Sequence, residues 1–211
     1  MHGWDFPVLY HAVAARYGFA KVPNDFGAFH HADGAKFEIG RFTTSHVAGS
    51  IPASELLLFN DGIIAACADT NLAEWLLDDV MEWMISSGFL RPSVTLRPRT
   101  YVSHVIVQFD KLAPDGLKHI FGTAGGLDAA LAAHYGDNRT MSLSRLTFSV
   151  DPRTSSSPGQ HIGFTLERRA HVPYDQNWFW SSAPLPLAIH LSVLETMEDD
   201  FVKTGNILSG R

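Results

Sequence analysis

The chain has 211 residues, and its 45% hydrophobic content is enough to bury a sizeable core without disulfides or metal ions. Its formal net charge of −6 disfavours a general nucleic-acid binder, because phosphate contacts need a basic surface. The only cysteine, Cys67, excludes an intrachain disulfide and favours a reducing compartment.

The amino terminus lacks the basic start and long apolar core of a secretory signal. No run of about 18 uninterrupted apolar residues occurs, so no membrane-spanning helix is expected. We therefore expect a cytoplasmic protein that is not inserted in a membrane.

The first third of the chain predicts a helix, a loop and a strand. Apolar residues recur at helical spacing over residues 6–18, and Gly18 is a natural helix end. Residues 19–34 have the glycine and proline content of a loop. Residues 36–43 alternate, with Phe37 and Ile39 expected on one side of a half-buried strand.

Residues 54–68 predict a β-hairpin, because two apolar runs flank an Asp-Gly turn at residues 61–62. A helix should follow at once, capped by Asp69 or Thr70 and ended by Gly88. Most of its carboxylates fall on the solvent face, but Asp79 lies nearer the apolar stripe.

In the rest of the chain, strands are predicted from alternating apolar and polar residues, and loops and breaks from glycine and proline. Residues 91–99 read as a connector, and residues 113–136 as two short helices broken at glycines. Strands are expected at residues 101–110, 142–150 and 162–167, and a last helix ends near residue 203.

This order predicts an α+β fold with a mainly antiparallel sheet of about six strands and helices mostly on one face. We expect a single domain over residues 1–211, with a weaker alternative in which the chain divides near residues 90–100.

Eleven histidines raise the question of a metal site. His30, His31 and His46 show no metal-ligand spacing, so we expect structural or loop histidines and no bound metal or other cofactor. Cys67 sits among small apolar residues and is expected to be inert.

A polar sheet face is the first candidate site. If the alternation holds, six residues face away from the core: His104, Gln108, Thr147, Ser149, Thr165 and Glu167. Such a face can bind a ligand or simply contact water. Were it catalytic, His104 and Glu167 would be the acid–base pair, because histidine titrates near neutral pH and a carboxylate can orient it.

The aromatic segment 172–186 is the second candidate. Tyr174, Trp178 and Trp180, with Arg168 and Arg169 upstream, have the composition of a protein interface. The alternative is a long connection that folds back to cover the core.

No catalytic motif is present in the chain, so we expect a non-enzymatic assembly or adaptor protein. It would act through a protein partner or a second copy of itself, and not through nucleic acid or a membrane. The alternative is a small-ligand-binding protein or enzyme that uses the polar sheet face.

Overall fold

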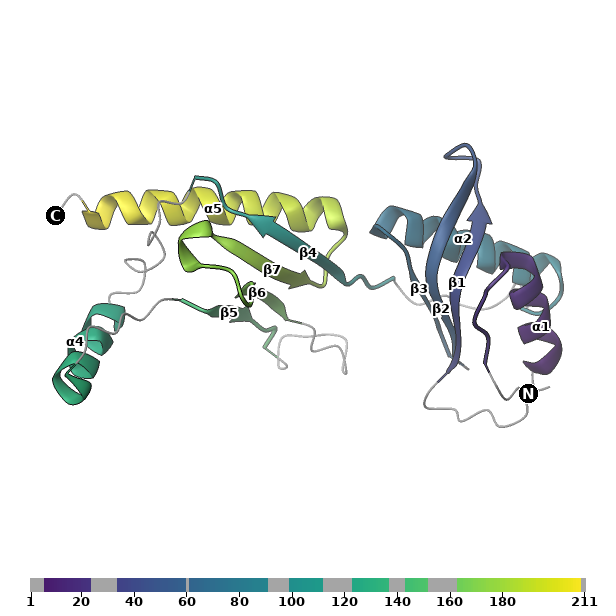
Figure 1. The fold of residues 1–211 in the computed structure, drawn as a ribbon. Coiled ribbons are helices and arrows are strands. Elements are labelled where there is room, and N and C mark those ends of the chain that lie inside the picture. The colour runs from purple at the N-terminus through teal and green to yellow at the C-terminus, as the bar shows by residue number, and fades with distance from the viewer. Residues whose placement is uncertain are drawn as a thin grey trace. The chain divides into compact units, whose positions relative to one another are not determined.

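The computed structural model describes residues 6–23, 34–59, 61–90, 99–111, 123–136, 143–151 and 163–209. The chain forms two compact units, residues 1–99 (unit 1) and residues 100–211 (unit 2), and each has its own buried core. The ribbon in Figure 1 labels their helices and strands.

Unit 1 is a three-stranded antiparallel sheet, in the order β1-β2-β3, packed with two helices. Its elements are α1 (Phe6–Tyr17), β1 (Ala35–Thr43), β2 (Ser50–Leu58), β3 (Ile63–Ala66) and α2 (Thr70–Ser86). One apolar stripe of each helix enters the core: Leu9 and Val13 from α1, Leu76 and Val80 from α2. Both helices therefore share a single core with the sheet.

The predicted hairpin and following helix are both present. Phe59 N donates to Gly62 O at 2.9 Å across the turn between β2 and β3. Asp69 caps α2, since its carboxylate accepts a hydrogen bond from Leu72 N at 2.9 Å. Gly88, with φ of 77°, follows the helix end and has the backbone conformation that glycine adopts freely.

Strand β1 departs from the predicted alternation at Ile39. Phe37 is buried, but Ile39 is 59% exposed and has φ of 60°, a left-handed conformation rarely adopted by a β-branched residue. Beyond this point the even-numbered residues Gly40 and Phe42 are buried instead. The expectation that Phe37 and Ile39 share one side is therefore wrong, because the backbone turn at Ile39 reverses the alternation.

Unit 2 is a four-stranded antiparallel sheet in the order β4-β7-β6-β5. Its elements are β4 (Ser103–Gln108), α4 (Thr123–Tyr135), β5 (Arg145–Phe148), β6 (Phe164–Arg168), the 3₁₀ turn η1 (Tyr174–Gln176), β7 (Trp178–Ala183) and α5 (Leu187–Ser209). Leu194 of α5 packs with Phe109, Leu166 and Phe179 in the core. Figure 1 shows α5 running along this sheet.

The α+β class and the antiparallel pairing are confirmed, with two corrections. The strands form two sheets and not one, because β4 pairs with β7 and not with a strand of unit 1. Residues 178–183, for which no strand is predicted, form the interior strand β7. Strand alternation predicts which face a residue occupies, but not which distant strand it pairs with.

The boundary between the units falls after Arg99, within the stretch where a subdivision was the weaker expectation. Whether the chain unfolds as one domain or two stays a prediction. In the part of the chain that the structure describes, no helix combines the length and apolar character needed to cross a membrane.

Candidate functional site

Among the described residues, α5 packs on one face of the unit 2 sheet, and the opposite face is open to solvent at Ile106, which is 52% exposed. Side chains at alternate positions, such as Val105, Leu166 and Phe179, pack toward α5 in the core. The side chains between them form what we name the outer face: His104, Ile106, Gln108, Arg145, Thr147, Thr165, Glu167, Trp178, Trp180 and Ser182. Five of the six polar residues predicted to face away from the core are thus on one surface.

Trp180 lies at the centre of the outer face. The strand register places it between Ile106 of β4 and Glu167 of β6. The His104 ring stacks on the Trp180 ring, with centroids 5.5 Å apart and planes 17° apart. Ile106 is 52% exposed, so an aromatic and aliphatic patch reaches the surface here.

Charged groups border this patch. Arg145 Nε lies 3.5 Å from Glu167 Oε2 across β5 and β6. The Arg169 guanidinium carbon lies 5.9 Å from the centre of the Trp178 ring, within cation–π range. Apolar rings at the centre with charges at the edge are the arrangement that protein interfaces use.

Two of the predicted interface residues occupy a different place. Arg168 is only 8% exposed and donates from Nε to Leu143 O at 2.9 Å and from Nη1 to Tyr174 O at 2.6 Å. Its guanidinium lies 4.5 Å from the Tyr174 ring and 5.0 Å from that of Phe179. Arg168 therefore connects η1 to the sheet on the face that packs with α5. Tyr174 lies beside Arg168 on this inner side and not on the outer face.

His104 and Glu167, the predicted acid–base pair, share the outer face without adjoining. Strand β7 runs between β4 and β6, so two strand spacings of about 4.8 Å separate their backbones. The ring of Trp180 stacks on His104, and Glu167 pairs with Arg145. A direct hydrogen bond between imidazole and carboxylate does not suit this arrangement.

A buried histidine that the sequence did not single out joins α5 to the sheet. His190 is fully buried, with Ser103 Oγ 2.7 Å from Nδ1 and Ser181 Oγ 2.8 Å from Nε2. Ser181 Oγ donates to Thr165 O, so it accepts from Nε2–H, and Nδ1 accepts from Ser103. All groups are satisfied by a neutral imidazole, and burial, with a smaller effect of His104, lowers its pKa.

This Ser–His–Ser chain has the residue types of a nucleophile and its base. Ser103 is 5% exposed, and Ser181 and His190 are fully buried. A substrate has no access to hydroxyls buried to this extent, so the chain serves the packing of α5. The sequence contains one signal for this site: His190 is the only polar residue in the apolar helix turn at residues 187–191.

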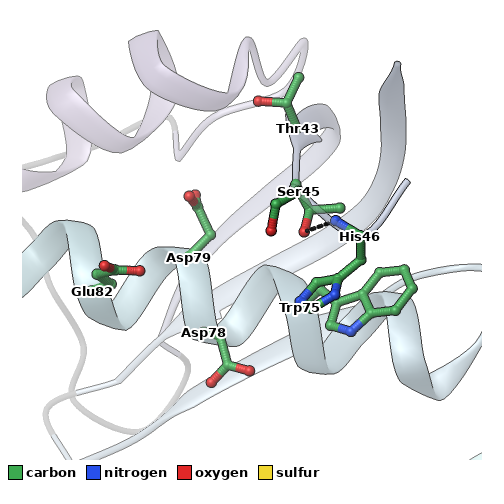
Figure 2. A pocket seen from close by; sticks show the side chains of 8 residues that line it. Thr43, Ser45, His46, Trp75, Asp78, Asp79 and Glu82 are labelled. Atoms are coloured by element: carbon green, nitrogen blue, oxygen red, sulfur yellow. Dashed lines mark hydrogen bonds between the residues drawn. The ribbon is translucent and has the colours of Figure 1, made fainter. Parts of the chain in front are cut away.

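Unit 1 carries a polar pocket of about 320 Å³ between the β1–β2 connection and α2. Figure 2 draws its lining side chains and labels Thr43, Ser45, His46, Trp75, Asp78, Asp79 and Glu82. The His46 ring stacks on Trp75 with centroids 4.8 Å apart. The sequence predicts a loop histidine at His46 and gives no sign of its contact with Trp75 of α2.

Asp79, the helix carboxylate nearest the apolar stripe, is held by two residues of α1. Arg16 Nη2 lies 2.8 Å from Oδ1, and Tyr17 Oη donates to Oδ2 at 2.7 Å. Burial, reinforced by this bond to Asp79, raises the pKa of the Tyr17 phenol. Asp78 pairs with Arg99. Two of the three carboxylates in the pocket are thus neutralised from outside it.

The pocket has room for a small polar molecule. No group of three or more metal-ligating side chains that could hold an ion occurs among the described residues. His30 and His31 lie outside those residues.

Cys67 directly follows β3 and is half-buried. Burial, with the nearby Asp69 carboxylate, raises the pKa of its thiol to about 11. The side chain is therefore a protonated thiol at neutral pH, a poor nucleophile and metal ligand.

Comparison with known proteins finds no matching family, curated protein or solved structure.

Proposed function

We propose that this protein is a non-enzymatic assembly or adaptor protein that makes protein–protein contacts through the outer face of the unit 2 sheet. One observation carries the proposal: Trp178 and Trp180 lie on the same open face of the central strand β7, beside the exposed Ile106.

Tryptophan is the residue type most favoured at the energetic centre of protein interfaces, because it buries a large rigid area and retains a polar N–H. Strand β7 holds Trp180 between β4 and β6, so little conformational freedom remains to be lost on binding. Arg145, Glu167 and Arg169 at the border would orient a partner. The activity needs no cofactor, and a cytoplasmic location stays a prediction.

Native mass spectrometry of the protein, gently purified from its own source, tests the proposal. We expect the wild-type protein to form a defined complex. The double variant Trp178→Ala, Trp180→Ala should bind its partner at least about tenfold more weakly, because interface tryptophans typically contribute about 2 kcal/mol or more each. Circular dichroism would verify that the variant keeps its fold.

Tyr174→Ala is the matched control. Tyr174 is also an exposed aromatic residue of unit 2, but it packs against Arg168 and does not belong to the outer face. We expect this variant to retain the complex. A strictly monomeric wild-type protein, or a complex that survives loss of both tryptophans, would contradict the proposal.

The alternative function, a small-ligand binder or enzyme, would use the same outer face. It is favoured by the polar groups around Trp180, chiefly the stacked His104 and Glu167. A monomer that carries extra small-molecule mass in the native spectrum would support this alternative. Loss of that mass in His104→Ala would assign the ligand to the outer face.

A further inference from the structure

Among the described strands, none pairs with the outer edge of β4. This strand ends the sheet order, and its six residues Ser103–Gln108 include no charge, glycine or proline. Proteins usually protect an edge with charged residues, proline, bulges or short strands, because free backbone groups recruit other strands. The opposite edge, β5, has four residues and begins with Arg145.

The edges of the other sheet are also interrupted or short. Lys21 forms an isolated bridge with Glu38 on β1, and Ile39 interrupts that strand. Strand β3 has four residues. Among the described strands, β4 is therefore the longest uninterrupted edge without a charged residue.

The hydrogen-bond pattern identifies which groups of β4 are directed outward. Phe109 N donates to Asn177 O at 3.1 Å, and Val107 is registered with Phe179. In an antiparallel pair, alternate residues direct both backbone groups to the same neighbour. The odd-numbered residues thus bond to β7, while the N–H and C=O groups of His104, Ile106 and Gln108 point to the open edge.

The sequence of β4 is complementary to itself. In an antiparallel pairing of two copies about a two-fold axis at Ile106, Ile106 meets its own counterpart, Val105 meets Val107, and His104 meets Gln108. Apolar residues then oppose apolar ones, polar residues oppose polar ones, and no like charges meet. The outward backbone groups would form about six hydrogen bonds in this register.

We propose that two copies of this chain pair through β4, antiparallel and centred on Ile106, so that their unit 2 sheets join into one continuous sheet. The near-palindromic order of residues 104–108 lets two copies pair with similar side chains opposite each other, which favours a second copy over an unrelated strand as the partner. The inference rests on the proposed function and names a second copy as a partner. Pairing would also extend the outer face, with its tryptophans, across both copies.

Sedimentation equilibrium of the full chain at micromolar concentrations tests the pairing. We expect a wild-type dimer. Ile106→Lys would place two ammonium groups opposite each other at the axis. Ile106→Pro would remove an N–H directed at the partner but none bonded to β7. Each variant should weaken dimerisation at least about tenfold.

Thr147→Lys on β5 is the matched control. Arg168 N donates to Ser144 O, so Thr147 directs its backbone groups to the opposite edge of the same sheet. This variant should dimerise like the wild type. Circular dichroism would show whether each variant is folded, and Ile106→Lys replaces the proline variant should that one unfold.

A wild-type monomer throughout the concentration range, or a dimer that tolerates both Ile106 variants, would overturn the pairing. The same measurement on Trp178→Ala, Trp180→Ala separates this inference from the proposed function. A dimer lost only in the tryptophan variant refutes β4 pairing and supports contact through the outer face. A dimer lost only in the Ile106 variants supports β4 pairing. If every native complex also survives in the tryptophan variant, contact through the outer face is refuted.

Discussion

At the scale of single residues, His190 shows how a polar side chain can hold a core together. Its imidazole connects α5 to Ser103 of β4 and to Ser181 of β7. Because Ser181 donates to Thr165 O, the bonds run in one direction through a neutral ring. Protonation would place a second donor on the ring opposite the Ser103 hydroxyl, inside a buried site.

We predict that acid weakens unit 2 through His190. The pKa of His190 is lowered by burial from its usual value near 6.5. Above that pH the ring is neutral in both states, while below it the unfolded chain binds more protons. The free energy of unfolding should therefore fall as the pH drops below about 6.5 and level off below the folded pKa.

Urea unfolding between pH 7.5 and pH 5 measures this effect. His190→Gln should show a flatter pH dependence, whereas His134→Gln, an exposed substitution on α4, should behave like the wild type. Equal acid sensitivity of the wild type and His190→Gln would assign the effect to other groups.

At the scale of elements, β1 shows that a local backbone turn can override an alternating sequence. Residues 35–37 alternate as predicted, with the odd-numbered residues buried. After the positive φ of Ile39, the even-numbered residues are buried instead. Opposite it, β2 makes the same change: Ala53 and Leu56, three residues apart, are both buried. The paired strands thus change alternation at the same point.

We predict that Ile39→Gly stabilises unit 1 by about 1 kcal/mol. A β-branched residue at φ of 60° is strained, glycine adopts this φ without penalty, and little burial is lost because Ile39 is 59% exposed. Ile64→Gly is the control, since Ile64 is 51% exposed in a strand without positive φ. Chemical denaturation should show the control destabilised, and a destabilised Ile39→Gly would show that the strain is small.

At the scale of the whole molecule, the two units have separate cores. Leu56 is fully buried in the core of unit 1, and Leu166 is 1% exposed in that of unit 2. The sheets share no strand. Separate cores favour separate unfolding, although the composition and order of elements had favoured a single domain.

Calorimetry of the full chain tests the division with one cavity in each core. Leu56→Ala and Leu166→Ala should each cost about 2–5 kcal/mol. We expect each substitution to lower a different thermal transition and leave the other in place. A single transition that both substitutions lower would instead support one cooperative domain over residues 1–211.

Elements whose causes are local could be predicted from the sequence. The β2–β3 hairpin, the Asp69 cap and the apolar stripe of α2 each involve residues close together in the chain. Strand alternation likewise placed His104, Thr165 and Glu167 on the face opposite α5. These features follow from the 3.6- and 2-residue periods of helices and strands, so they need no knowledge of distant partners.

Which strands pair, and therefore which residues form the candidate site, could not be predicted without the tertiary structure. It brought Trp178 and Trp180 from a presumed connection into a central strand, and it buried Arg168 under Tyr174. It also enclosed His190 between two serines from different strands. Pairing and burial depend on contacts between residues far apart in the chain, where the sequence pattern of one segment says nothing about its partner.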